Sequence, residues 1–527
     1  MSLRRQLGLA NASQFYLDGR LEGGGGADPA LRFENRATTY EELFHTAGRA
    51  GNLFAESGVG FENRVVLILP DSPLFVAAFF GLMRIGAVPV PVSTRLAPAE
   101  YLYILADCRP EAVVITSEHR PMLDGILRQL DDYGLPRPSH VWVTDSDLSS
   151  PPYEPLARHL DGAVSLCRVR PTRGDDVALI QYTSGSTGIP KGVVHLHRGL
   201  LEVARHIPGR LKLHKGDVCF SAAKLSFGYG LGNSVFFPLS VGACSVLMAG
   251  PADPYSVYDT VRRELPTVFF GVPSLYSAIL SVPRCATEFD LSSVRLFVSA
   301  GERLSAGLFK RWKETFGSEI VEGFGSTECL HVFISSEEGC IKPGSTGTLI
   351  EGNEAKLVGD DGRPAAVGEP GELYVKSGAN AARYWNRQDE TAATMVGPWT
   401  RTGDVLYCDE DGYFFFVGRT DDLLKVGGLK VSPAEIEEAL LLHEAVAECA
   451  VVCPEREDGT NVIVAYVRPR EGWEAVSGVK RKLRAHLGGL LASHKLPREI
   501  IFVSELPRTF TGKVARYKLR SPAEAPR

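Results

Sequence analysis

Short runs of apolar, often β-branched residues alternate with longer amphipathic stretches along most of the chain. Residues 64–69 (RVVLIL) have the composition of a strand, and residues 72–85 after them are spaced as in a helix. Such alternation predicts parallel sheets covered by helices, an α/β fold. We expect further strands at residues 112–117, 177–182, 244–248, 268–271 and 296–299.

The pattern changes after Gly412, where a strand meets a charged, glycine-containing connection and then a helix. Ser432 and Pro433 mark the start of this helix, and Glu435 stands three residues after Ser432, as in a capping box. We therefore predict a boundary near Asp421, between a large N-terminal domain (residues 1–420) and a small α+β domain (residues 421–527). In the small domain we expect strands at 449–452, 461–467 and 500–503 and a basic helix at 479–491.

Length and composition agree with two soluble domains. A chain of 527 residues exceeds the roughly 250 to 300 residues that one hydrophobic core supports. The net charge of -6 argues against nucleic-acid binding, which needs a basic surface. The apolar run at residues 74–89 is interrupted by Arg84 and two glycines, and the first residues hold no apolar stretch of signal-peptide length, so we expect no membrane span and no export. Ten cysteines without a CxxC pair fit reduced thiols and a cytoplasmic protein.

One segment has the composition of a phosphate-binding loop. YTSGSTGIPKG, from Tyr182 to Gly192, follows an apolar strand and combines glycines, hydroxyl groups and Lys191. Glycines let backbone N–H groups approach an anion, and the lysine adds positive charge. The segment is not a Walker loop, because no Lys-Ser or Lys-Thr pair follows at the required spacing. A flexible Ser/Gly turn is the alternative.

This loop resembles the signature of the adenylate-forming superfamily, which includes acyl- and aryl-CoA ligases, carrier-protein adenylation domains and beetle luciferases. Four other motifs of the superfamily follow in order. FGSTE ends at Glu328 and resembles the adenine and magnesium motif, TGD ends at Asp404 and resembles the ribose motif, GRTDDLLKVGG contains the hinge, and PRTFTGK ends at Lys513. The resemblance covers nearly the whole chain. It implies a large N-terminal domain with a β-barrel-like part and a small C-terminal domain that rotates on a hinge.

The resemblance assigns residues to ATP and Mg²⁺. Glu328 would hold Mg²⁺, Thr327 would contact a phosphate oxygen, and Lys191 would be catalytic. Asp404 would accept hydrogen bonds from the ribose hydroxyls and Arg419 would donate to them. A carboxylate that attacks the α-phosphorus of ATP brings negative groups together, so the site needs a hard cation and fixed donors. The remaining expected ATP contacts are Thr183, Ser184, Gly185, Ser186, Thr187, Gly188, Ala300, Gly301, Glu302, Gly323, Phe324 and Gly325.

The C-terminal motifs imply a two-step mechanism. Lys513 would neutralise the substrate carboxylate and the ribose oxygen during adenylation, although its basic neighbours also fit a solvated chain end. Asp421 occupies the hinge position, where a change of backbone angles would move Lys513 away. Gly427 and Gly428 would then line the path of the pantetheine arm, unless they form an ordinary turn. Lys425 and Lys430 are candidates for contacts with the phosphates of coenzyme A.

Two segments are expected to form the acyl pocket, KLSFGYGLGN (residues 224–233) and CLHVF (residues 329–333). Both resemble the segments of benzoate and hydroxybenzoate CoA ligases, and their flat apolar side chains and glycines suit an aromatic ring. The first segment has no aspartate to pair with an ammonium group, which disfavours an α-amino acid. His331 either donates to the substrate or is a pocket wall. The expected pocket residues are Phe227, Tyr229, Gly230, Leu330, His331 and Val332.

These observations predict an AMP-forming acid–thiol ligase that uses ATP, Mg²⁺ and coenzyme A to convert benzoate or a substituted benzoate to its CoA thioester. Three alternatives remain at this point: an acyl-AMP synthetase that loads a carrier protein or a partner enzyme, a luciferase-like oxygenase, and a non-catalytic nucleotide- or acyl-binding protein. The expected partners are small molecules, and the expected state is a monomer or a homodimer.

Overall fold

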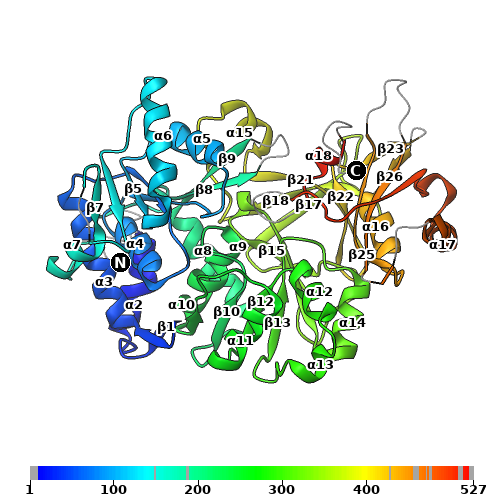
Figure 1. The fold of residues 1–527 in the computed structure, drawn as a ribbon, viewed down its shortest axis with the longest axis horizontal. Helices are drawn as coiled ribbons and strands as arrows, with labels where there is room; N and C mark the ends of the chain where they lie inside the picture. Colours follow the sequence, from blue (N-terminus) through cyan, green and yellow to red (C-terminus); the bar gives the residue numbers. More distant parts are fainter. Residues whose placement is uncertain are drawn as a thin grey trace.

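The computed structural model describes residues 10–147, 150–184, 189–426, 429–454, 462–470, 472–473, 477–508 and 514–520. It is a mixed α/β structure with a large N-terminal domain and a smaller C-terminal domain (Figure 1). No helix within these residues is long and apolar enough to span a membrane.

A nine-stranded sheet forms the centre of the large domain, in the order β16-β15-β14-β13-β12-β10-β11-β1-β2. The six strands from β14 to β1 run parallel, and antiparallel strands complete both edges. β12 and β13 have the bounds expected from the sequence. The strands are β1 (Pro29–Phe33), β2 (Arg36–Thr39), β10 (Val218–Ser221), β11 (Cys244–Val246), β12 (Val268–Gly271), β13 (Leu296–Ser299), β14 (Ile320–Gly325), β15 (Val332–Ser335) and β16 (Thr348–Leu349).

A second parallel sheet, in the order β4-β3-β5-β6-β7, contains the first predicted strand. Helix α4 (Pro73–Arg84) follows β3, and the Ser72 side chain caps it by accepting a hydrogen bond from the Phe75 N–H. Ten of its twelve residues are buried, because α4 packs into the main core on the α3 side. The strands are β3 (Arg64–Ile68), β4 (Val88–Pro91), β5 (Ala112–Ile115), β6 (His140–Val143) and β7 (Tyr153–Pro155).

Two antiparallel sheets complete the large domain. The hairpin of β8 (Val177–Ser184) and β9 (Pro190–Leu196) is extended by β19 (Arg383–Tyr384). In place of the expected barrel-like part the structure has a five-stranded antiparallel sheet. Its strands are β17 (Asn353–Val358), β18 (Gly371–Ser377), β20 (Met395–Val396), β21 (Trp399–Cys408) and β22 (Phe414–Arg419).

The C-terminal part has its own hydrophobic cores. Helix α16 (Pro433–Leu441) begins where the sequence indicates, with the Ser432 hydroxyl accepting from the Glu435 N–H. A three-stranded sheet, β25-β26-β27, packs beside it. The predicted strands and the basic helix are present with bounds shifted by a few residues: β25 (Val446–Val452), β26 (Val464–Pro469), α17 (Ser477–Gly488) and β27 (Glu499–Phe502), together with β23 (Leu424–Val426), β24 (Leu429–Val431) and α18 (Arg516–Arg520).

Helices cover the sheets of the large domain, as the alternating pattern indicates (Figure 1). They are α2 (Gly19–Glu22), α3 (Tyr40–Glu56), α5 (Pro98–Cys108), α6 (Arg120–Asp132), α7 (Leu156–Gly162), α8 (His197–Arg210), α9 (Gly228–Leu231), α10 (Phe237–Val241), α11 (Pro254–Glu264), α12 (Pro273–Ser281), α13 (Cys285–Glu288), α14 (Ala306–Phe316) and α15 (Gln388–Thr394). The short π or 3-10 turns are η1 (Gln14–Asp18), η2 (Ser117–His119), η3 (Gly232–Phe236), η4 (Thr327–Cys329) and η5 (Ser493–Lys495).

Candidate active site

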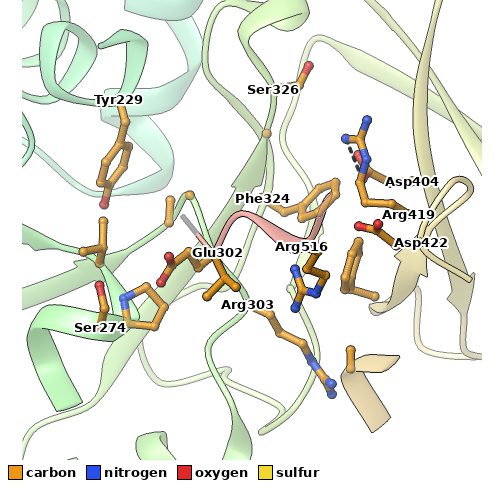
Figure 2. Close-up of a pocket in the computed structure, with 18 of the residues that line it drawn as sticks. Tyr229, Ser274, Glu302, Arg303, Phe324, Ser326, Asp404, Arg419, Asp422 and Arg516 are labelled. Carbon is orange, nitrogen blue, oxygen red and sulfur yellow. Dashed lines mark hydrogen bonds and ion pairs between the residues drawn. The ribbon is translucent and has the colours of Figure 1, made fainter. Parts of the chain in front are cut away.

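A cavity of about 1840 Å³ lies where the large domain meets the C-terminal domain. Residues at the carboxyl ends of the parallel strands β12, β13 and β14 form much of its wall, the usual place for ligands in parallel sheets. Figure 2 shows Tyr229 at one side of this cavity and the pair of Asp404 and Arg419 at the other, with Glu302 and Phe324 between them. The cavity therefore joins the motifs that are far apart in the sequence.

The β8–β9 hairpin brings the ends of the predicted phosphate loop together. Thr183 lies directly opposite Lys191 in the antiparallel register, and both line the cavity. Ser184, the last residue of β8, pairs with Pro190 through the backbone. Gly185, Ser186, Thr187 and Gly188 lie outside the described residues. The hairpin thus places a hydroxyl and an ammonium group beside each other at the cavity wall.

Glu328 is held by contacts from a neighbouring segment. It lies in the turn η4, and its carboxylate Oε1 accepts a hydrogen bond of 2.7 Å from the Tyr384 hydroxyl. Its backbone carbonyl accepts one of 2.7 Å from the Ala381 N–H. Burial, and secondly the Glu328 carboxylate, raise the pKa of Tyr384, so the phenol stays protonated and donates. Sequence reasoning did not identify Tyr384, because it lies outside the five motifs considered.

The backbone around η4 is unusually constrained. Leu330 has φ 67° and ψ -40°, a conformation that costs free energy and is typical of functional sites. A Cβ atom at Gly325 would lie 2.2 Å from the His331 carbonyl oxygen, so this position requires glycine. Thr327 and Glu328 are consequently presented to the cavity on a tight turn.

The donor set around Glu328 fits Mg²⁺ bound together with a nucleotide. Mg²⁺ in such sites takes one or two carboxylates and fills its other positions with phosphate oxygens and water. Oε1 of Glu328 accepts the hydrogen bond from Tyr384, so Oε2 is the oxygen that would bind Mg²⁺. Within the described ranges no group of three or more His, Cys, Asp or Glu side chains is arranged so that it could hold a metal ion.

Asp404 and Arg419 face each other on adjacent strands. They are register partners in β21 and β22, and Nη1 of Arg419 lies 3.0 Å from Oδ1 of Asp404 (Figure 2). The Asp404 carboxylate raises the pKa of Arg419, and Asp404 itself is 4% exposed. Both residues line the cavity, so the pair is available for a polar ligand.

Five of the six residues expected for the acyl pocket line the cavity: Phe227, Tyr229, Leu330, His331 and Val332. The Tyr229 hydroxyl donates to the Gly271 carbonyl at 3.1 Å, and burial raises the pKa of Tyr229, so its ring forms a neutral wall. Gly230 is placed differently from the expectation. It is buried below the wall, where a Cβ atom would lie 2.1 Å from the Lys224 carbonyl oxygen, so close packing explains this glycine.

His331 is a neutral residue of this pocket. Burial lowers the pKa of its imidazole to about 4, and Nε2 lies 3.3 Å from the Tyr229 carbonyl oxygen. Its ring packs edge-on against Phe237. A second polar side chain, that of Gln181 on β8, also lines the cavity although it is 2% exposed, and its amide atoms have no hydrogen-bond partner among the described residues. The pocket is therefore apolar with a few buried polar groups.

The remaining predicted ATP contacts on the large domain also line the cavity. Ala300, Gly301 and Glu302 follow β13, and Gly323, Phe324 and Gly325 end β14. Beside them lies Glu322, which sequence reasoning missed. Glu322 is 4% exposed, accepts from the Leu304 N–H at 3.1 Å, and has its pKa raised to about 8 by burial.

The C-terminal candidates are only partly described. Asp421 is an exposed residue at the cavity edge. Lys513, Gly427, Gly428 and the side chains of Lys425 and Lys430 lie outside the described residues. Arg508 and Val514, which flank the segment containing Lys513, pair as an isolated antiparallel bridge and line the cavity. The two ends of this segment therefore face the site formed by the large domain.

Comparison with known proteins places this geometry in a family. The profile of the AMP-binding enzyme matches residues 22–385, and that of the AMP-binding enzyme C-terminal domain matches residues 435–513. A benzoate–CoA ligase of Thauera aromatica is 38% identical over 514 residues, which cover 97% of this chain and 96% of that protein. A 4-hydroxybenzoate–CoA/benzoate–CoA ligase of Rhodopseudomonas palustris is 39% identical, covering 97% and 94%.

Solved structures show the same architecture. The crystal structure of an anthranilate CoA ligase in complex with anthranoyl-AMP superimposes with a TM-score of 0.92 at 36% identity, covering 99% of each chain. A benzoate CoA ligase from Burkholderia xenovorans LB400 superimposes with a TM-score of 0.87 at 35% identity, covering 97% of this chain and 100% of that one. The resemblance carried by the five motifs is confirmed, and the chain belongs to the AMP-binding enzyme family.

Proposed function

We propose that the protein is an AMP-forming aryl-CoA ligase. It joins benzoate or a substituted benzoate to the AMP part of ATP, releasing pyrophosphate, and then transfers the acyl group to the thiol of coenzyme A, releasing AMP. The observation that carries this proposal is the single cavity in which the aromatic walls formed by Phe227 and Tyr229 lie with Lys191, Glu328 and Asp404. The names of the relatives that match nearly the whole chain, ligases of benzoate and hydroxybenzoate, support the same substrate class.

In the first step, the described residues position the reacting groups. Lys191 and Thr183, side by side on the two strands of the hairpin, would bind phosphate oxygens, and the pair of Asp404 and Arg419 would hold the ribose. Glu328 would hold Mg²⁺, which supplies charge neutralisation between the two anions. The neutral His331 avoids placing an unpaired charge beside the aromatic ring.

The two steps require two arrangements of the C-terminal domain. We place the domain boundary at residues 420/421 and the hinge at Asp421, which is exposed at the cavity edge. Lys513 would serve the first step from the segment between Arg508 and Val514. After rotation, Gly427 and Gly428 would line the pantetheine path, with Lys425 and Lys430 near the phosphates of coenzyme A. The cytoplasm, where thiols stay reduced, suits the ten free cysteines.

A mass-spectrometric assay tests the proposal. The protein is incubated with ATP, Mg²⁺, coenzyme A and a panel of benzoates, cinnamates and medium-chain acids, and AMP and acyl-CoA are measured. We expect a benzoyl-type thioester in amounts equal to the AMP formed. Exchange of pyrophosphate with ATP that needs an aromatic acid, without any thioester, would instead support an acyl-AMP synthetase that loads a carrier or partner protein. No turnover of any aromatic acid would overturn the proposed function.

A further inference from the structure

A short segment outside the five motifs, residues 381–384, supports the turn that carries Glu328. Ala381 and Tyr384 both contact Glu328, the first through its N–H to the Glu328 carbonyl and the second through its hydroxyl to Oε1, each at 2.7 Å. Both residues are only 6% exposed. The segment is itself fixed, because Tyr384 is the register partner of Val193 in the β9–β19 pair. One short segment, residues 381–384, therefore contacts both the backbone and the side chain of Glu328.

The same tyrosine also contacts the lysine of the phosphate loop. Nζ of Lys191 lies 5.5 Å from the centre of the Tyr384 ring, within the range of a cation–π interaction. Tyr384 lines the cavity together with Lys191 and Glu328. One side chain therefore lies between the cation that would bind phosphate and the carboxylate that would bind Mg²⁺, and it contacts both.

We propose that Tyr384 is a positioning residue for the first half-reaction: its hydroxyl fixes the Glu328 carboxylate so that Oε2 faces the metal, and its ring keeps Lys191 directed at the phosphates. Outer-shell hydrogen bonds of this kind orient ligating groups, and losing one typically weakens metal binding about 10- to 100-fold. The inference rests on the proposed function, because it takes Glu328 as the metal-binding residue.

The test measures metal binding directly. Mn²⁺ replaces Mg²⁺, and free Mn²⁺ is measured by electron paramagnetic resonance in the presence of a non-hydrolysable ATP analogue, for the full-length wild-type protein and for Tyr384→Phe. We expect the Mn²⁺ dissociation constant of the variant to rise about 10-fold or more. In steady-state assays the Mg²⁺ concentration for half-maximal rate should rise in parallel, while the KM of the aromatic acid stays within about twofold. An unchanged Mn²⁺ dissociation constant would overturn the inference.

Tyr374→Phe is the matched control. Tyr374, on β18, also lies beneath a lysine, with Nζ of Lys356 at 5.2 Å from its ring, but it does not line the cavity. This substitution should leave Mn²⁺ binding unchanged. If Tyr384 acts through the carboxylate, adding Tyr384→Phe to Glu328→Gln should weaken Mn²⁺ binding by much less than it does in the wild type.

The outcomes separate the two proposals. A wild-type protein that makes no thioester overturns the proposed function whatever Mn²⁺ binding shows. A wild-type protein that makes thioester, paired with a Tyr384→Phe variant that binds Mn²⁺ normally, overturns the inference alone. If Tyr384→Phe fails to fold, the Tyr384 hydroxyl is needed for the stability of the fold, and this result would also overturn the positioning role.

Discussion

The guanidinium of Arg303, in the loop after β13, lies 2.9 Å from the carboxylate of Glu438 on α16. The ion pair joins the large domain to helix α16 of the C-terminal domain, and both of its residues line the cavity. In the same arrangement Arg508 and Val514, at the two ends of the Lys513 segment, face the cavity. The ion pair therefore stabilises the domain arrangement of this structure, which we propose is the one used in the first half-reaction.

Replacing Arg303 with alanine should slow adenylate formation relative to thioester formation. The two side chains are 22% and 27% exposed, so the pair contributes about 1 kcal/mol or less, which corresponds to at most about a fivefold change. Pyrophosphate exchange and thiolation of supplied acyl-AMP measure the two steps separately. Lys313→Ala is the control. It removes the ion pair between Lys313 on α14 and Glu319, within the large domain, and should change neither rate. A larger loss in thiolation than in exchange would contradict this role.

Replacing Lys513 with alanine should nearly abolish adenylate formation and leave the thiolation of supplied acyl-AMP largely intact. The reason is charge: a lysine between the carboxylate and the ribose oxygen is needed only while two anions approach each other. Single-turnover formation of acyl-AMP and of acyl-CoA would be followed separately. Equal losses in both steps would remove Lys513 from its assigned role.

Much of the fold was predictable because its signals are local. The bounds of β12 and β13 match the apolar runs, and Ser432 caps α16 as its spacing indicates. The strand order was not predictable. β1 lies beside β11, with Leu31 paired to Ser245, and no local pattern specifies a partner so distant in the chain. Long-range pairing is decided by packing of the whole core.

The residues of the candidate site likewise fall into those that a local motif indicates and those that depend on long-range pairing. Lys191, Glu328, Asp404 and Arg419 belong to motifs, and the fold places all four on one cavity. Tyr384 belongs to none of the five motifs named above, and its contact with Glu328 forms only when β19 pairs with β9. Gly230 was predicted to be a site residue but is a packing residue. A glycine in a pocket segment suggested space for a ring, whereas the Lys224 carbonyl oxygen fills that space.

Glu322 should make the protein less stable as the pH rises. Burial, which outweighs the hydrogen bond from the Leu304 N–H, raises the pKa of this carboxyl from 4.5 to about 8. Between these two values the folded protein binds one more proton than the unfolded chain, so the free energy of unfolding falls by up to about 1.4 kcal/mol for each pH unit. Above pH 8 this contribution no longer changes.

Glu322→Gln checks this expectation, because the amide has the same shape and does not titrate. We expect the unfolding temperature of the variant, measured relative to the wild type, to increase steadily from pH 5 to pH 8. Glu319→Gln is the control for the pH dependence of the unfolding temperature. Glu319 is nearer the surface than Glu322 and directly precedes β14, the strand that contains Glu322. A difference between Glu322→Gln and wild type that stays constant over this range would show that the carboxyl titrates at an ordinary pKa.

Replacing Asp421 with proline should impair the second half-reaction and spare the first. Asp421 is exposed, and the backbone bonds of this turn are donated by the neighbouring Thr420, Asp422 and Leu423, so the ring should be tolerated in the arrangement seen in the structure. Proline fixes φ and restricts the residue before it, which opposes the change of backbone angles that rotation requires. We expect pyrophosphate exchange within about threefold of wild type and a loss of thiolation of roughly 100-fold, about 3 kcal/mol in the barrier.

Asp421→Ala, which keeps the backbone free, should retain both activities. Unimpaired thiolation in the proline variant would show that the hinge lies elsewhere.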